Sequence, residues 1–462
     1  MARDSIGAAG RPSASLSVLD AAAIVIGIVV GIGIFKTPAL VADSTDSEAV
    51  FLLLWVAGGV VSLLGALCYA ELAAAYPSAG GEYHFLSRAY GRAIGFLFAW
   101  GRMTVIQTGA IAAIAFVFGD YAAVLLPLGP HGPSLYAALA VVILTWVNVR
   151  GLRSSRPVQL VFTAATVGAL GAVVLGGFGS DAIEPPAARS DAAGTISLAM
   201  VFVLLTYGGW NEAAYLSGEI RDVQRNMIRV LLLGLGVVVA AYVLVNLAYL
   251  NVLGLAAMRG SSIVAADLMH HAFGPAGAMA LSGAIVVAAI STLNGTIFTG
   301  ARTSYALGRD FSPFRALGHW DGRAMAPANA LLVQGAISLL LVLLGTLTRD
   351  GFTTMVEYTA PVFWLFFLLA GLSLFVLRWR DPERRLPFRV PFYPLTPLVF
   401  CGACGYMLYA SLAYTGIGAL FGAGVLLAGT PLLAWLRPVA AGPAYRAGNR
   451  PRLYRSRALR RI

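Results

Sequence analysis

Residues 27–38 read GIVVGIGIFKTP and lie inside a long apolar run, yet they include three glycines, Gly27, Gly31 and Gly33. A glycine inside a helix costs about 0.8–1 kcal/mol relative to alanine, and a main-chain polar group without a partner costs several kcal/mol in lipid. Two explanations fit these glycines. Either Gly27 and Gly31 form a GxxxG contact with a neighbouring helix, or the helix is interrupted here.

The composition places this stretch in a membrane protein. Hydrophobic residues make up 59% of the 462 residues and charged residues 11%, whereas about 45–50% of the residues in soluble domains are apolar. Long apolar runs predict an all-α integral membrane protein with twelve transmembrane helices, of which the fourth is short. The runs are residues 18–42, 50–76, 93–127, 135–149, 157–178, 196–218, 227–254, 276–306, 326–347, 355–378, 395–413 and 416–436.

The basic residues orient this bundle, because lysine and arginine favour cytosolic loops. With both termini in the cytosol, 28 of the 32 basic residues fall on the inner side, and the outer side receives Lys36, Arg189, Arg259 and Arg349. We therefore expect a multi-pass protein of the cytoplasmic membrane. Its cytosolic tails are residues 1–17 and 437–462, and the basic second tail is expected to contact anionic lipid rather than nucleic acid.

Enzyme signatures are missing from the sequence. The five histidines fall in predicted loops or at helix ends, and the motifs HExxH, GxSxG and the P-loop do not occur. Cys68, Cys401 and Cys404 lie in predicted spans and indicate no disulfide framework. We expect no enzyme, no cofactor and no metal centre.

The sixth apolar run repeats the feature of the first. It contains TYGGWNEA at residues 206–213, with Gly208 and Gly209 at mid-span. Two interrupted helices at corresponding places in two five-helix halves, residues 18–178 and 196–378, indicate a secondary transporter with inverted repeats. Residues 395–436 contain the last two apolar runs and lie outside these two halves.

Interrupted helices offer main-chain groups to a solute. Free amides near Ile32 and Gly33 would attract an anionic group such as a carboxylate. Free carbonyls at Val29, Leu205 and Gly208 would accept hydrogen bonds from an ammonium group. Together these groups predict a site for a zwitterion, of which an amino acid is the simplest.

Five stretches carry further motifs: GIGIFKTP (31–38), GALCYAELAAAYPSAGGEYHFLSRAYG (65–91), LTWVNVRGLRSS (144–155), TYGGWNEA (206–213) and SGEIRDVQRNM (217–227). They resemble the amino acid-polyamine-organocation superfamily, and those of helices 4 and 6 are most similar to its L-type amino acid transporter branch. The resemblance implies a LeuT-type fold with discontinuous helices 1 and 6, two peripheral helices and alternating access.

The resemblance also implies site residues. It places the substrate carboxylate on the amides of Gly31, Ile32 and Gly33, and the ammonium group on the carbonyls of Val29, Leu205 and Gly208. Beside these lie Trp210 and Asn211 of helix 6 and Gln107 and Gly109 of helix 3. Gly109 would leave room for a substrate side chain in a mostly apolar pocket, which favours neutral amino acids. Leu205 stands where relatives have an aromatic gate, so Trp364 becomes the gate candidate.

Ion coupling stays open in the sequence. Thr166 stands where the branch usually has a lysine. Ser291 and Thr292 have hydroxyls that could bind Na⁺, although such hydroxyls commonly bond to their own helix. Glu212 could exchange a proton, face a cationic substrate group or only stabilise a helix N-terminus. Exchange and symport with Na⁺ or H⁺ are therefore all open.

Two charged residues near helix ends have simpler expectations. Glu71 is expected to pair with a cytosolic arginine. Lys36 would lie about 9 Å from the outer end of helix 1, near enough to extend to the membrane surface, and a role in an outer vestibule is the alternative. Residues 261–273 are amphipathic and predict a short outer helix.

The sequence also bears on partner subunits and on other possible functions. Eukaryotic members of the branch bind a single-span glycoprotein through a cysteine between helices 3 and 4, whereas residues 127–136, PLGPHGPSLY, contain none. We therefore expect no disulfide-linked subunit. The alternatives to an amino acid carrier are a polyamine or organic cation permease, and a channel or membrane receptor built on the same bundle.

Overall fold

The computed structural model describes residues 16–76, 81–151, 156–182, 194–213, 220–321, 326–348, 350–413 and 416–435. Within these residues the chain is helical, apart from turns, loops and isolated β-bridges that join Leu16 to Ile220 and Asp321 to Ala326. Eight described helices are long and apolar enough to cross a membrane. Four shorter apolar helices fall in the first, fifth, sixth and twelfth predicted runs. The all-α prediction is confirmed, whereas the twelve-span arrangement and the repeat boundaries stay predictions.

The helices follow one another in this order: α1 (Val18–Val29), η1 (Ile32–Phe35), α2 (Thr37–Ala42), α3 (Glu48–Ala75), α4 (Gly81–Tyr90), α5 (Arg92–Gly101), the π-helical η2 (Arg102–Ile106), α6 (Gln107–Leu125), α7 (Gly132–Val149), α8 (Arg156–Gly179), α9 (Ile196–Thr206), α10 (Trp210–Ala213), α11 (Val223–Val252), α12 (Gly254–Met258), α13 (Val264–Asp310), η4 (Ser312–Phe314), α14 (Ala328–Thr346), α15 (Gly351–Arg380), α16 (Leu395–Ala413), α17 (Ile417–Leu427) and η5 (Pro431–Trp435).

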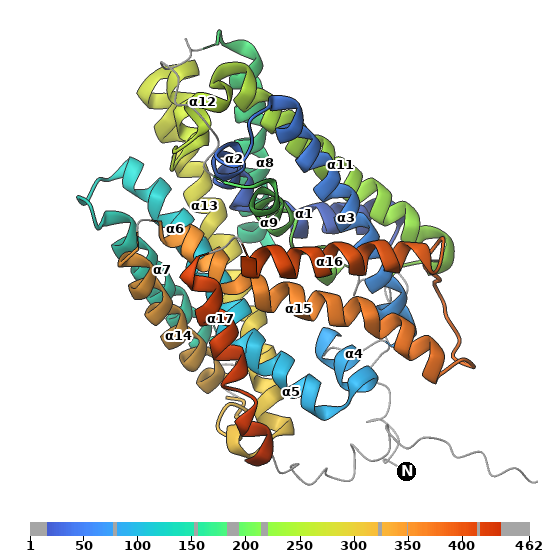
Figure 1. The fold of residues 1–462 in the computed structure, drawn as a ribbon. Helices are drawn as coiled ribbons and strands as arrows, with labels where there is room; N and C mark the ends of the chain where they lie inside the picture. Colours follow the sequence, from blue (N-terminus) through green and yellow to red (C-terminus); the bar gives the residue numbers. More distant parts are fainter. Residues whose placement is uncertain are drawn as a thin grey trace, which may run out of the picture.

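The bundle encloses its short helices and exposes apolar side chains around its circumference. In Figure 1, α1, α2 and α9 lie among the long helices α3, α11, α13 and α16. Large apolar side chains such as those of Leu175, Leu347 and Phe421 are exposed. Exposing so much apolar surface to water is unfavourable, so this surface is suited to contact with lipid.

The two ends of the bundle differ. Helices α4 and α5 lie at one end and α12 at the opposite end (Figure 1). We call the first the basic end, because it carries Arg88, Arg92 and, where α15 ends, Arg378 and Arg380. The opposite one is called the α12 end.

Helix 1 is discontinuous, as the sequence predicts. Its first part, α1, ends at Val29, and Val30 and Gly31 have extended backbones before η1 begins at Ile32. A Cβ atom added at Gly27 would meet nothing within 4 Å, and one at Gly31 would meet only the Val29 carbonyl oxygen, at 3.9 Å. The GxxxG contact is therefore wrong, and Gly31 is the glycine that lies at the interruption.

Helix 6 is interrupted opposite the first break. Helix α9 ends at Thr206, and a turn over residues 207–209 leads into α10. Gly209 has φ +101°, and a Cβ atom there would lie 2.8 Å from the carbonyl oxygen of Ile28 in α1. Only glycine combines this dihedral with so close a contact between two main chains. The rest of the predicted span, residues 214–219, lies outside the described residues.

The predicted short helix at residues 261–273 is confirmed. Helix α13 bends at Gly274, which has φ +68° and precedes Pro275. The bend separates the segment Val264 to Phe273 from the long membrane part of α13. By contrast, nothing in the sequence predicted the π-helical turn η2, a type of turn that is frequent at functional sites.

The crossing of the two breaks can be tested by substitution at Gly209. We expect Gly209→Ala to lower the free energy of unfolding by about 1–3 kcal/mol, because alanine is strained at positive φ, and its methyl group would also meet the Ile28 carbonyl. Thermal unfolding of the detergent-solubilised protein measures the loss. Gly27→Ala is the matched control and should leave the melting temperature unchanged or higher. Equal melting temperatures for both variants would contradict the assigned crossing.

Candidate functional site

A tyrosine of α11 braces the break in helix 1. The hydroxyl of Tyr242 donates to the Val29 carbonyl at 3.2 Å and accepts from the Gly31 N–H at 3.4 Å. These two main-chain groups were expected to hold the ammonium and carboxylate of a substrate. Tyr242 therefore occupies, in this structure, part of the site that the sequence predicts. Sequence reasoning missed it, because a tyrosine in an apolar run carries no signal of its direction.

An aromatic cluster positions this tyrosine. The rings of Trp55, Tyr207 and Tyr242 lie 5.1 to 6.1 Å apart, centroid to centroid. The Tyr207 hydroxyl donates to the Trp55 carbonyl at 2.9 Å. All three side chains are fully buried, so the cluster joins α3, the turn of helix 6 and α11 beside both breaks.

Other main-chain groups at the breaks remain available. The first N–H groups of a helix have no acceptor inside it, and among the described residues no side chain caps η1 at Ile32 and Gly33. The Leu205 carbonyl accepts from the Gly208 N–H at 3.0 Å, which leaves it a second lone pair. Gly31, Gly33, Leu205 and Gly208 are half-buried, whereas Val29 and Ile32 are buried. Accessible surface thus persists at both breaks.

The parts of helices 1 and 6 that lead toward the α12 end are bound to each other. The hydroxyls of Thr37 and Thr206 share a hydrogen bond of 2.7 Å. Thr37 also donates to the Gly33 carbonyl at 2.9 Å, and an added Cβ atom at Gly33 would lie 3.3 Å from the Thr206 side chain. These contacts fix η1 and α2 against α9.

Trp210 lies in a second aromatic cluster. Its ring centroid is 5.3 Å from that of Tyr69, 5.2 Å from that of Phe367 and 5.8 Å from that of Phe400. The side chain is buried, so the contacts that the structure gives it are with other core aromatic rings.

Asn211 reaches toward the basic end instead of the breaks. Its amide lies 3.5 Å from a carboxylate oxygen of Glu82. Glu82 also accepts from the Tyr69 hydroxyl at 3.0 Å and pairs with Arg102 at 3.0 Å. We call Tyr69, Glu82, Arg102 and Asn211 the Glu82 network. It connects helix 6 to η2 in helix 3, and the sequence did not predict it.

The two residues predicted on helix 3 pack against neighbouring helices. Gln107 donates from its amide to the Thr296 carbonyl of α13 at 2.8 Å. A Cβ atom at Gly109 would lie 2.2 Å from the Thr359 methyl group of α15. The expectation that Gly109 leaves room for a substrate side chain is therefore wrong, because Thr359 fills that space.

The coupling and gate candidates lie elsewhere. The Thr292 hydroxyl donates to the Ala288 carbonyl of its own helix at 3.1 Å. This is the alternative to Na⁺ binding that the sequence left open for this hydroxyl. Thr166 on α8 and Ser291 on α13 are half-buried on two helices that pack together. The side chain of Glu212 lies outside the described residues. Trp364 is buried, with its ring centroid 5.1 Å from that of Phe363 in α15.

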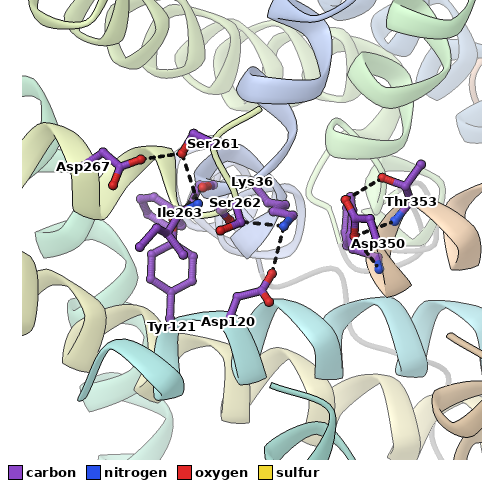
Figure 2. A network of polar contacts seen from close by, with 11 residues as sticks. Lys36, Asp120, Tyr121, Ser261, Ser262, Ile263, Asp267, Asp350 and Thr353 are labelled. Atoms are coloured by element: carbon purple, nitrogen blue, oxygen red, sulfur yellow. Dashed lines mark hydrogen bonds and ion pairs between the residues drawn. The ribbon is translucent and has the colours of Figure 1, made fainter. Parts of the chain in front are cut away.

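The two charged residues near helix ends have different outcomes. Glu71 pairs with Arg378 at 2.6 Å, which confirms the expected arginine partner. Lys36 was expected to extend to the membrane surface, and this is wrong. Its ammonium group is buried and pairs with Asp120 of α6 at 2.9 Å (Figure 2). The structure supplies a carboxylate inside the bundle, so the lysine does not need water.

A cavity of about 260 Å³ opens at the basic end, away from the breaks. Its charged groups have structural partners: Arg378 binds Glu71, and Arg384 donates two hydrogen bonds to the Ala75 carbonyl. Nearby on α4, burial together with Arg88 and Arg384 lowers the pKa of His84. Its imidazole is therefore neutral near pH 7. Among the described residues, no three His, Cys, Asp or Glu side chains gather as metal ligands.

A helical membrane bundle in which two interrupted helices cross, with main-chain groups left available at both, has the architecture of a permease for a small solute. The model of the amino acid permease family matches residues 16–434, and the chain belongs to that family. Within the amino acid-polyamine-organocation superfamily, its relatives are L-type amino acid transporters, as the motifs indicated. Family and relatives are transporters, so the expectation of a protein that is not an enzyme is confirmed.

Two relatives illustrate the similarity. The chain is 30% identical to the b(0,+)-type amino acid transporter 1 of Homo sapiens over an alignment of 389 residues. This alignment covers 81% of this chain and 78% of that protein. It is also 30% identical to the large neutral amino acids transporter small subunit 2 of Mus musculus over 438 residues. That alignment covers 90% of this chain and 80% of the relative.

The brace at the first break can be tested with Tyr242→Phe. Losing the hydroxyl leaves the Val29 carbonyl and the Gly31 N–H unpaired, which should lower the free energy of unfolding by about 1–3 kcal/mol. Added leucine can pair both groups, so we expect it to raise the melting temperature of this variant more than that of the parent. Tyr207→Phe is the control: it loses one hydrogen bond to Trp55 and should keep the parental response to leucine. Identical leucine responses in all three proteins would refute the role of Tyr242.

Proposed function

We propose that this chain is a secondary transporter that moves L-amino acids across the cytoplasmic membrane by alternating access. The observation that carries the proposal is the crossing of two helix breaks, where Ile32 and Gly33 offer amides and Leu205 offers a carbonyl with a spare lone pair. Amides at a helix start bind a carboxylate, and carbonyls accept from an ammonium group. An amino acid has both groups on one carbon atom.

We propose a preference for neutral amino acids. The side chains next to the main-chain groups are those of Val29, Ile32 and Leu205, which give the solute an apolar surrounding. A cationic side chain would be costly to bury there without a partner. The printed name of one relative, a large neutral amino acids transporter, fits this preference. A polyamine permease, the alternative, would leave the amides at Ile32 and Gly33 without an anionic ligand.

We propose that the basic end faces the cytosol, because basic residues favour the cytosolic side and arginines accumulate at this end. Arg88, Arg92, Arg378 and Arg380 lie at that end. The α12 end, with Lys36 and Arg259, then faces outward, and both terminal tails would be cytosolic.

We propose exchange of one amino acid for another, without a coupled ion. Of the two hydroxyls considered for Na⁺, that of Thr292 donates to Ala288 in its own helix. Symport with Na⁺ or H⁺ is the alternative that the transport assay must exclude.

We propose that no disulfide-linked subunit is needed. The printed name of one relative calls that protein a small subunit, so a partner chain is a fair question. Here Cys68, Cys401 and Cys404 are all buried in helices, and a buried thiol cannot reach a second chain. Only a non-covalent partner would fit this arrangement.

Counterflow in proteoliposomes tests the carrier mechanism. Vesicles loaded with unlabelled leucine should take up labelled leucine at least about tenfold faster than empty vesicles. The reason is that the binding site of an exchanger turns back to the outside only with an amino acid bound, and only loaded vesicles supply one inside. A channel would give no such acceleration. Replacing Na⁺ by choline or removing the pH gradient should leave the rate unchanged, and a rate that falls with either ion would replace exchange by symport.

Competition in the same vesicles tests specificity. Unlabelled leucine, isoleucine and phenylalanine should each reduce leucine uptake more than arginine or spermidine at equal concentration. The physical reason is the apolar surrounding of the breaks. Stronger competition by arginine would contradict the neutral preference, and competition by spermidine alone would favour the polyamine alternative.

A further inference from the structure

The single lysine of the chain is buried at the α12 end. The side chain of Lys36 is 4% exposed and that of its partner Asp120 is 17% exposed. The ammonium group lies 2.9 Å from an Asp120 carboxylate oxygen and 3.1 Å from the Ser262 carbonyl oxygen (Figure 2). Lys36 belongs to helix 1, Asp120 to helix 3, and Ser262 to the loop before α13. One ammonium group thus joins three separate parts of the chain.

Residues next to Lys36 and Asp120 also link helix 1 to helix 3. Tyr121, which follows Asp120, donates from its hydroxyl to the carbonyl of Phe35, which precedes Lys36, at 2.6 Å. Further along, Arg259 donates to the carbonyls of Ala42 and Thr45 at 3.0 and 2.6 Å. The α12-end half of helix 1 is therefore fastened along its length to helix 3 and to the loop after α11.

The other nearby carboxylates are engaged elsewhere. Asp350 accepts from the N–H groups of Phe352 and Thr353 at the start of α15 (Figure 2). Asp267 accepts from the Ser261 hydroxyl. Asp120 is the carboxylate whose hydrogen bond the structure assigns to Lys36.

We propose that Lys36 and Asp120 form a latch that closes the outer end of the transport path. The inference rests on the proposed alternating access and orientation. Opening would move α2 away from α6 and admit water, which hydrates both charges. In the closed state each charge depends on the other, because removing one leaves its partner buried without an opposite charge. The pair therefore holds the path closed, and either charge alone would favour the open state, in which water hydrates it.

The latch is adjacent to the proposed binding site. Lys36 directly follows η1, the turn that begins with the free amides of Ile32 and Gly33. A solute held by these amides contacts the same short turn that ends at the latch. Binding can thereby influence closure through one rigid turn of the main chain.

Thiol labelling measures the latch without any transport substrate. Val117 is buried and lies one helical turn before Asp120 and Tyr121 on the same face of α6. The reporter is Val117→Cys in a chain whose three buried cysteines are replaced by alanine. A membrane-impermeant maleimide added outside proteoliposomes of known orientation reports the opening of this path.

Single neutralisation should open the path. We expect Lys36→Met and Asp120→Asn each to raise the labelling rate of Val117→Cys at least about tenfold, because each leaves a buried charge unpaired in the closed state. The double variant loses the ion pair that closes the path but leaves no charge buried alone, so it should label at least about threefold faster than the parent and more slowly than either single variant. The matched control neutralises the exposed pair of Arg88 and Asp381 at the basic end, and should label at the parental rate.

Three outcomes would overturn the latch: single variants that label at the parental rate, a double variant that labels at the parental rate, or a control pair that accelerates labelling equally. If a single variant gives no monodisperse protein, Lys36→Arg and the double variant decide, since neither leaves an unpaired charge. Lys36→Arg must keep the parental rate and the double variant must label faster, and failure of either result overturns the proposal. Failure of amino acid transport in the counterflow assay would leave these labelling results unaffected.

Discussion

Every main-chain polar group inside a bilayer needs a partner, and this constraint organises the whole molecule. Continuous helices satisfy it alone, but helices 1 and 6 do not. Tyr242 bonds two of the groups released at the first break, and the Thr37 hydroxyl donates to the Gly33 carbonyl beside the crossing. What these side chains leave unpaired is what a solute can bind. The candidate site thus consists of main-chain groups at the breaks that these side chains do not bond.

The breaks were predictable because glycine is an expensive choice in a membrane helix. Gly31 and the pair Gly208 and Gly209 mark both interruptions correctly, and Glu71 is paired with an arginine as its position suggested. The pairing of Lys36 with Asp120 was not predictable. The two residues are 84 positions apart, and their approach depends on how helix 1 packs against helix 3. Tyr242 was hidden for the same reason, since an apolar run does not reveal which face of its helix meets a break.

Three glycines show why glycine alone does not define a function. Gly27 has nothing within 4 Å of an added Cβ atom, Gly109 receives the methyl group of Thr359, and Gly209 has a positive φ beside a foreign carbonyl. The same residue type therefore accompanies a break, allows close helix packing or permits a backbone conformation that other residues resist. Sequence spacing cannot separate these roles, because each depends on atoms contributed by another helix.

Helix 3 connects the two ends of the molecule. Arg102 binds Glu82 at the basic end, and Asp120 binds Lys36 at the α12 end. The two residues are 18 positions apart, or about 27 Å along a helix at 1.5 Å per residue. Both pairs are formed together in this structure. Because neither pair shares a residue with the other, the alternating access proposed above would let water separate one while the second stays intact. An alternating mechanism needs this independence, and a single shared ion pair could not provide it.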